Sequence, residues 1–158
     1  MLHVDPNAQF RAGLKALRSG NEERAMLHFG AALDGQMERG GNDRDTGRYL
    51  SYYGLSMALC RGANHESLRA CQRAVNLDNC DADLFLNLAR VYLMARKKTR
   101  AMEIISRGLR IDPAHSGLTR LQAREERRAR PLVPMLHRDH PLNRSLGRLR
   151  SSLSRRAS

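Results

Sequence analysis

The pattern of apolar and polar positions repeats along this chain at a fixed spacing. Residues 67–78 and 101–112 carry the same arrangement 34 positions apart, so that Cys71 corresponds to Ile105. In both segments the apolar residues recur every three or four positions, which predicts an amphipathic helix. A period of about 34 residues, with two helical patterns in each unit, is typical of stacked helical hairpins.

A third copy of the pattern lies upstream, with Ala25, Phe29, Ala32 and Leu33 at the corresponding positions. It precedes the second copy by 42 residues, eight more than the period. We expect the extra residues to form a surface loop over 37–45, because this stretch contains the turn-forming run Gly-Gly-Asn-Asp. A functional insertion is the alternative, since inserted residues in repeat proteins often serve binding.

The pattern therefore predicts six helices that form three hairpins, followed by one more helix. A stack of hairpins needs a terminal helix with a polar outer side to cover its last apolar face. The short apolar stripe of the segment after Pro113 suits that capping role. We expect the helices at about 6–18, 22–37, 46–60, 65–77, 81–95, 98–111 and 116–130.

Small residues mark the places where two helices of a hairpin approach closely. Gly13, Gly54 and Ala89 occupy this position in the first helices of the three units. The chain resembles a tetratricopeptide-repeat (TPR) protein over about residues 6–113, although Asn79 and Gln9 depart from that family's usual Pro and aromatic. The resemblance rests mainly on the third unit, through Phe85, Leu88, Ala89, Tyr92, Ala101, Ile105, Gly108 and Pro113.

This resemblance implies an all-α fold. We expect a right-handed superhelix of three TPR hairpins, a C-terminal capping helix and a basic tail. The predicted domains are 1–130, the repeats with their capping helix, and 131–158, a Pro-containing and Arg-rich tail. Composition agrees, because the chain is 41% hydrophobic and only 4% aromatic, and Ala- and Leu-rich helices pack well without large aromatics.

The N-terminal residues contain no apolar run long enough for a signal peptide, and no segment has the roughly 20 apolar residues of a membrane span. A cytoplasmic location is therefore expected. The three cysteines, Cys60, Cys71 and Cys80, lack the spacing of zinc ligands. Cys71 is expected to be a buried packing residue, and Cys80, in a loop, is the thiol to test for reactivity.

Positive charge is concentrated at the C-terminal end. The chain has a net charge of +12, and residues 114–158 contain eleven Arg, no Lys and three acidic residues. Within the tail, leucines at 142, 146, 149 and 153 share one side of a predicted helix, whereas Arg144, Arg148 and Arg150 lie off that stripe. These three arginines are candidates for contacts with nucleic acid or an anionic membrane. Alternatively, residues 131–153 lie in the molecule's own groove.

No constellation of catalytic residues is recognisable. The sequence lacks a Gly-rich phosphate loop, a Gly-x-Ser-x-Gly elbow and a His-Glu-x-x-His run, and its six histidines are scattered. We therefore predict that the protein is not an enzyme and needs no cofactor, metal or small-molecule substrate.

The TPR resemblance implies a groove lined by the first helix of each unit, with a protein or peptide as the partner. Arginines in such a groove suit paired hydrogen bonds to carboxylates, while Asn87 suits a peptide backbone and the aromatics suit apolar side chains. The alternative is that these arginines are only solvated surface. The predicted lining is Phe10, Arg11, Leu14, Arg48, Ser51, Tyr52, Leu55, Leu86, Asn87 and Arg90.

Overall fold

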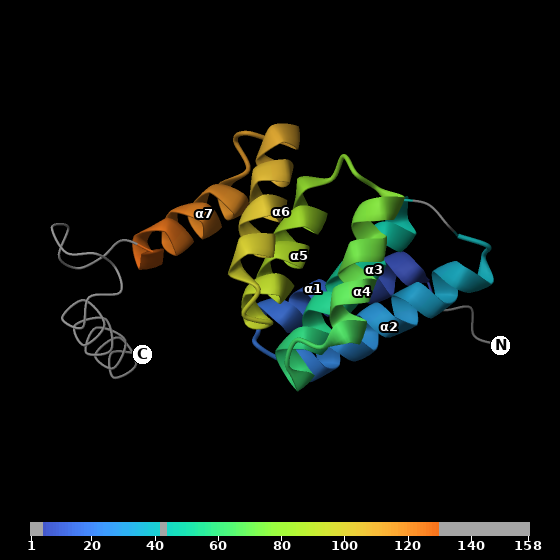
Figure 1. The fold of residues 1–158 in the computed structure, drawn as a ribbon. Coiled ribbons are helices and arrows are strands. Elements are labelled where there is room, and N and C mark those ends of the chain that lie inside the picture. Colours follow the sequence, from blue (N-terminus) through green and yellow to red (C-terminus); the bar gives the residue numbers. More distant parts are fainter. Residues whose placement is uncertain (1–4, 42–43, 130–158) are drawn as a thin grey trace, which may run out of the picture. The chain divides into compact units, whose positions relative to one another are not determined.

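A computed structural model describes residues 5–41 and 44–129 of the chain. Within these ranges every regular element is a helix, as the sequence pattern predicted (Figure 1). None of the described helices is long and apolar enough to cross a bilayer. The seven helices are α1 (Pro6–Arg18), α2 (Glu22–Glu38), α3 (Arg44–Arg61), α4 (His65–Leu77), α5 (Ala82–Met94), α6 (Lys98–Ile111) and α7 (Ser116–Ala129).

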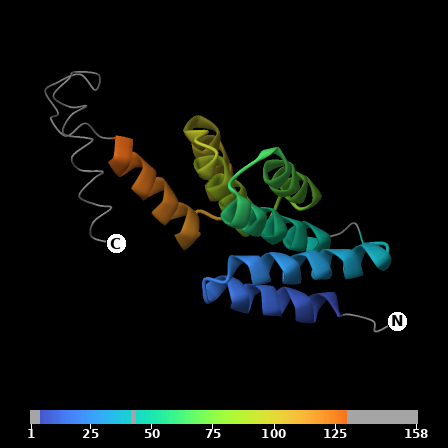
Figure 2. The same ribbon diagram turned by 90° about the horizontal axis from the view of Figure 1, so that it is seen from below.

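The first six helices form three hairpins, α1–α2, α3–α4 and α5–α6, whose two helices pack against each other. Neighbouring hairpins meet where α2 packs against α3 and α4 packs against α5, and α3 also packs against α5 (Figure 2). This arrangement confirms that the repeated segments 67–78 and 101–112 fall on α4 and α6, the second helices of adjoining hairpins. The chain divides into two compact units, Met1–Thr119 and Arg120–Ser158, and we describe each by itself.

Local sequence explains where the helices begin and end. The Asp5 carboxylate caps α1, because its two oxygens accept hydrogen bonds from the backbone N–H groups of Asn7 and Ala8 at 3.2 and 3.1 Å. Pro6 occupies the first helical position, where the missing N–H costs nothing. The turn after α5 contains Arg96 in the left-handed region, with a φ of 59°.

The structure corrects the expected loop over residues 37–45. α2 has 17 residues and α3 has 18, whereas the other four hairpin helices have 13 or 14. Residues 37–38 belong to α2 and residues 44–45 to α3, whereas residues 39–41 lie outside any helix as expected. Met37 and Glu38 continue α2, since both are good helix formers, and the positive φ of Gly40, 73°, follows the end of the helix.

The core of the first unit holds a cluster of aromatic rings at one end and mostly aliphatic side chains at the other. Around the first hairpin, Phe10, Phe29 and Tyr49 are buried together. Around the third hairpin, Phe85, Ile105 and Leu118 are at most 1% exposed. A Cβ built on Gly108 would lie only 2.6 Å from Cδ1 of Leu118, so this glycine is what lets the first turn of α7 approach α6.

The tail beyond residue 130, including Arg144, Arg148 and Arg150, lies outside the described residues. The predicted domain boundary at residue 130 therefore remains a prediction.

Candidate functional site

A pocket of about 610 Å³ opens where several helix ends of the first unit meet. The beginning of α3, the segment between α4 and α5, the end of α6 and the residue before α7 contribute to it. We call it the helix-end pocket. It is lined by Arg44, Asp45, Arg48, Asp78, Cys80, Asp81, Ala82, Asp83, Ile111, Asp112 and His115.

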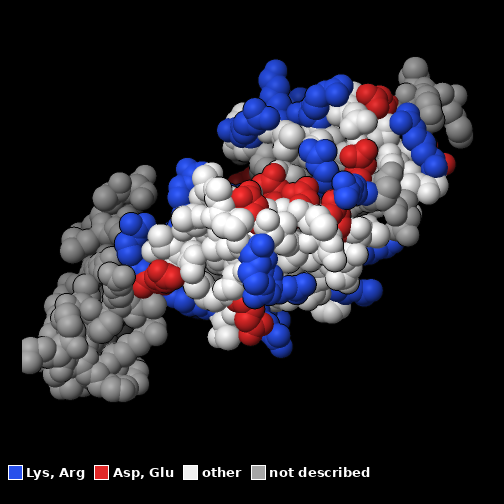
Figure 3. Space-filling model, turned by 90° about the horizontal axis from the view of Figure 1, so that it is seen from above, with Lys and Arg blue, Asp and Glu red and all other residues white. Residues whose placement is uncertain are grey.

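The helix-end pocket is acidic although the chain is basic. Five Asp carboxylates line it, against two Arg guanidiniums. Acidic side chains gather in the middle of the view in Figure 3, with Lys and Arg around them. The pocket therefore carries net negative charge, which attracts cationic groups and repels anionic ones.

Ion pairs within the pocket leave much of this charge accessible. The Arg44–Asp78 pair has an N···O distance of 3.7 Å and the Arg48–Asp45 pair one of 3.8 Å. Both arginine side chains are substantially exposed, at 79% and 47%. In the Arg48–Asp45 pair both side chains are about half exposed, whereas the Asp78 side chain is only 9% exposed. Solvent-exposed pairs contribute little to stability, so a partner can replace the Arg48–Asp45 pair at small cost.

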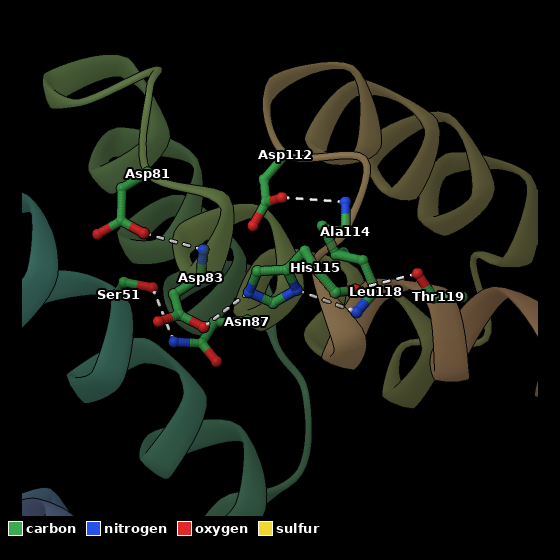
Figure 4. A network of polar contacts seen from close by, with 9 residues as sticks. All are labelled: Ser51, Asp81, Asp83, Asn87, Asp112, Ala114, His115, Leu118 and Thr119. Atoms are coloured by element: carbon green, nitrogen blue, oxygen red, sulfur yellow. Dashed lines mark hydrogen bonds and ion pairs between the residues drawn. The ribbon is translucent and has the colours of Figure 1, made fainter.

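The same acidic side chains also organise the backbone. The Asp81 carboxylate caps α5 by accepting a hydrogen bond from the Asp83 N–H at 2.9 Å, and the Asp112 carboxylate accepts one from the Ala114 N–H at 3.0 Å (Figure 4). Asp83, in the first turn of α5, faces His115 with an Oδ1–Nε2 distance of 3.1 Å. Some of the negative charge of the pocket thus belongs to Asp residues that cap helices or turns.

The pKa of Tyr52 depends on its burial and on the charges beside the pocket. Burial raises the pKa of its hydroxyl, and the carboxylates of Asp83 and Asp81 raise it further, while Arg48 and Arg90 act in the opposite direction. The raised pKa means that burial and negative charge together outweigh the two arginines. Tyr52, Arg48 and Arg90, which the sequence analysis selected, are therefore electrostatically coupled to the acidic residues of the pocket.

The structure corrects half of the predicted groove lining. Arg11, Arg48 and Arg90 are exposed, and Leu14 and Tyr52 are partly exposed. The other five residues belong to the core and offer almost no surface to a partner. We call these five the buried seam: Phe10, Ser51, Leu55, Leu86 and Asn87, which are between 0% and 7% exposed.

Phe10 shows why the seam is buried. Its ring lies 5.5 Å from that of Phe29, 5.1 Å from that of Tyr49 and 5.3 Å from that of Tyr52. The Arg48 guanidinium covers it further, 5.2 Å from the ring centroid. An aromatic side chain enclosed in this way stabilises the junction of α1, α2 and α3 and is not available to anchor a partner.

Ser51 and Asn87 form a buried polar link between α3 and α5. The Asn87 side-chain amide donates to the Ser51 hydroxyl at 3.1 Å (Figure 4). The Cys71 thiol donates to the Ser51 carbonyl oxygen at 3.5 Å. Asn87 thus has a structural partner, instead of the peptide backbone that the sequence analysis suggested.

Sequence reasoning missed most of the helix-end pocket, although one signal was present. Asp78 and Asp112 occupy equivalent positions at the ends of two repeat units, and both line the pocket. A repeated acidic residue at a helix end indicates that charges from successive units converge. Two further lining residues follow the same period, since Ile111 lies in the repeated segment 101–112 and His115 stands 34 positions after Asp81, the N-cap of α5. Arg44 carries no such periodic signal.

Within the described residues, no group of three or more His, Cys, Asp or Glu side chains is arranged to hold a metal ion. The Tyr52 hydroxyl, the pocket carboxylates and the arginines are suited to hydrogen bonds and ion pairs with a docked chain segment.

Three antiparallel helical hairpins that stack in chain order define a helical-repeat protein. The fold is that of the tetratricopeptide repeats, as a solved structure shows. The crystal structure of YrrB, described as a TPR protein with an unusual peptide-binding site, superimposes with a TM-score of 0.61 and 17% sequence identity. The match covers 76% of this chain and 58% of YrrB, so this chain spans a little over half the length of that protein. No protein-family model and no curated protein matches the sequence.

Proposed function

We propose that this protein is a non-catalytic interaction module, an adaptor or assembly factor, that binds a segment of another protein at the helix-end pocket. The observation that carries the proposal is a charged pocket of about 610 Å³ on a TPR fold. TPR stacks typically serve as interaction scaffolds, because their repeated hairpins leave an extended surface for docking. That YrrB is described as having a peptide-binding site supports the same class of partner.

The binding surface that we propose extends from the pocket to Tyr52, Arg90 and Arg11. It replaces the groove lining that the sequence alone suggested, since Phe10 and the other seam residues support the fold. The excess of Asp side chains in the pocket favours a segment that carries Lys or Arg. Arg48 and Arg90 add sites for carboxylates, so a segment with both signs of charge fits this surface best.

The test is affinity capture from a cell lysate with charge-neutral variants of equal shape. The double variant Asp81→Asn/Asp83→Asn keeps the α5 cap, because Asn caps a helix as well as Asp does. We expect it to lose most captured partner while its circular dichroism and melting temperature stay the same.

Glu103→Gln is the matched control, because Glu103 lies on α6 outside the pocket and pairs only weakly with Arg100, at 3.3 Å. It should capture partner as the unchanged protein does. Equal capture by the double variant and the control would exclude the pocket as the binding site.

A second candidate is binding of nucleic acid or an anionic membrane by the tail. It is favoured by the eleven Arg among residues 114–158, since Arg suits phosphate contacts and such binding weakens steeply with salt. The full-length variant Arg144→Ser/Arg148→Ser/Arg150→Ser should lose retention on RNA or on anionic vesicles at low salt. Unchanged retention would remove this candidate. A cytoplasmic location remains a prediction for both functions.

A further inference from the structure

His115 connects two helices through both nitrogens of its imidazole ring. Its Nε2 lies 3.1 Å from Oδ1 of Asp83, in the first turn of α5. Its Nδ1 accepts a hydrogen bond from the backbone N–H of Leu118, in the first turn of α7, at 3.2 Å. Figure 4 shows the ring lying between the two partners.

The contact with Leu118 makes His115 the N-cap of α7. The helix begins at Ser116, and the Thr119 N–H donates to the His115 carbonyl oxygen at 3.1 Å, the first backbone bond of the helix. Leu118 is the third helical residue, whose N–H an N-cap side chain normally satisfies. Histidine is not among the common N-cap residues, and this cap operates only while Nδ1 carries no proton.

These two contacts together fix the protonation state of the ring. The Leu118 N–H is a donor, so Nδ1 has to be the acceptor. An ionised Asp83 carboxylate only accepts, so Nε2 has to carry the proton. A neutral imidazole with its proton on Nε2 satisfies both partners, whereas the other neutral tautomer and the imidazolium both present an N–H to the Leu118 N–H.

The turn that this cap holds is tightly packed. Leu118 is fully buried, and the nearest neighbours of Gly108 are the side chains of Leu118 and Phe85. A Cβ built on Gly117 would lie 2.7 Å from Cδ2 of Leu86. The first turn of α7 therefore covers the end of the third hairpin, and its order depends on local contacts that include the His115 cap.

We propose that His115 is a pH-sensitive latch on the first turn of α7. Neutral His115 holds the first turn of α7 to α5 through Asp83 and the Leu118 N–H. Acidification that protonates the ring adds a proton to Nδ1. The bond from Leu118 then breaks, the imidazolium keeps its partner Asp83, and the first turn of α7 loses its cap.

Charged groups from every adjoining element act on this protonation. The carboxylates in the same pocket favour the imidazolium, and the two arginines, the Leu118 N–H and the positive end of the α7 dipole oppose it. Whatever the balance of these charges, any protonation of Nδ1 removes the acceptor. The groups are Asp81 and Asp83 of α5, Asp112 before α7, Arg44, Asp45 and Arg48 of α3, and Asp78 at the end of α4.

The test is ¹⁵N NMR spectroscopy of the full-length protein between pH 8 and pH 5. At pH 8 we expect His115 to show an unprotonated Nδ1 and a protonated Nε2. As the ring titrates, the Leu118 amide should shift with the same midpoint, and its hydrogen exchange should accelerate about tenfold beyond the ordinary pH dependence, the usual effect of losing an N-cap. The amides next to His28, which contacts Gln9 instead of a helix N-terminus, serve as the internal control.

Two variants distinguish the effect of His115 protonation from a general effect of low pH on the protein. His115→Asn keeps an acceptor for the Leu118 N–H but has no proton to gain, so its Leu118 amide should stay unchanged over the same pH range. Asp83→Asn keeps an oxygen that can accept from Nε2 and leaves Nδ1 in place, so its Leu118 amide should still follow the titration of the ring.

The proposal is overturned by any of three results. These are a protonated Nδ1 at pH 8, a Leu118 amide that ignores the titration of the ring, or an equal response in His115→Asn. The first two need only the unchanged protein, so the test does not depend on how well a variant folds.

Discussion

The buried seam and the helix-end pocket both use helices α3 and α5, but the seam is shielded from solvent and the pocket is open to it. In the seam, Phe10, Ser51 and Asn87 are at most 5% exposed and contact only other parts of the protein. In the pocket, Arg48 and Asp83 keep about half of their side-chain surface. In this stack the neighbouring helices therefore cover five apolar or uncharged positions of the first helices, and mainly charged positions, with the partly exposed Tyr52, remain for a partner.

This contrast predicts that changes in the seam act on stability and changes in the pocket act on binding. The largest effect is expected for Phe10→Ala, which removes a buried ring from contact with three other aromatic rings. Such truncations lower the free energy of unfolding by about 3–5 kcal/mol. Chemical denaturation monitored by circular dichroism measures it.

Arg11→Ala is the control for Phe10→Ala, because Arg11 is the exposed neighbour. It should change the free energy of unfolding by less than about 0.5 kcal/mol. A Phe10→Ala protein that keeps its stability but loses its partner would move Phe10 from the seam to the binding surface.

The chemical reactivity of two cysteines distinguishes the buried seam from the helix-end pocket. Cys71 contacts Ser51 of the seam, and burial raises the pKa of its thiol to about 12. About one such thiol in ten thousand is ionised at pH 8, and only the thiolate reacts. Cys80 lines the pocket and is exposed. We expect an aromatic disulfide reagent at pH 8 to modify Cys80 at least about a thousandfold faster than Cys71.

The same thiol gives a pH dependence of stability. Its folded pKa is raised from an ordinary value near 9, so the unfolded chain loses this proton first as the pH rises. Stability is therefore full below pH 9 and declines from about 9 towards 12. Cys71→Ala should remove this component of the decline, and an unchanged alkaline profile would contradict a buried neutral thiol.

The link between Ser51 and Asn87 tests the polar part of the seam. Ser51→Ala leaves the buried Asn87 amide without the hydroxyl that accepts its hydrogen bond at 3.1 Å. An unsatisfied buried polar group costs about 1–3 kcal/mol. Thermal and chemical denaturation should show a loss in that range.

A double-mutant cycle supplies the control for Ser51. Ser51→Ala combined with Asn87→Leu removes both partners and should be more stable than the sum of the two single changes implies. Strict additivity would mean that the hydrogen bond contributes no coupling between α3 and α5.

Much of the fold could be predicted from the sequence, because it depends on spacing. The 34-residue period and the small residues Gly13 and Gly54 indicate the hairpins directly. The exact ends of α2 and α3 differ from the expected 22–37 and 46–60 by one or two residues, since helix propensity in Met37 and Glu38 competes with the loop signal of the following glycines. A helix signal and a loop signal are both present there, and only packing decides between them.

The site was harder to predict than the fold. A repeat pattern shows which helix a residue occupies but not how fully the next hairpin covers it. Phe10 and Tyr52 were both predicted to be accessible aromatics, yet Phe10 is 5% exposed and Tyr52 is only partly buried. The pocket formed at helix ends, where His115 caps α7 one period after Asp81 caps α5. The period marks this position, but it does not show that the two helix ends share a pocket.

Arg48 belongs to both regions and tests the boundary between them. Its guanidinium lies 5.2 Å from the centroid of the Phe10 ring, and it also lines the pocket, 3.8 Å from Asp45. Arg48→Ala should lower the free energy of unfolding by about 0.5–1 kcal/mol, the usual contribution of a cation–π contact near the surface. Arg48→Lys keeps the charge but not the planar stacking, so it should lose less stability while retaining affinity for a carboxylate in a partner.

Arg107→Ala is a parallel control, since Arg107 lies 5.5 Å over Phe85 outside the pocket and should affect stability alone. An Arg48→Ala protein with unchanged stability would show that the Phe10 ring is buried without Arg48. Arg48 would then contribute to the pocket alone.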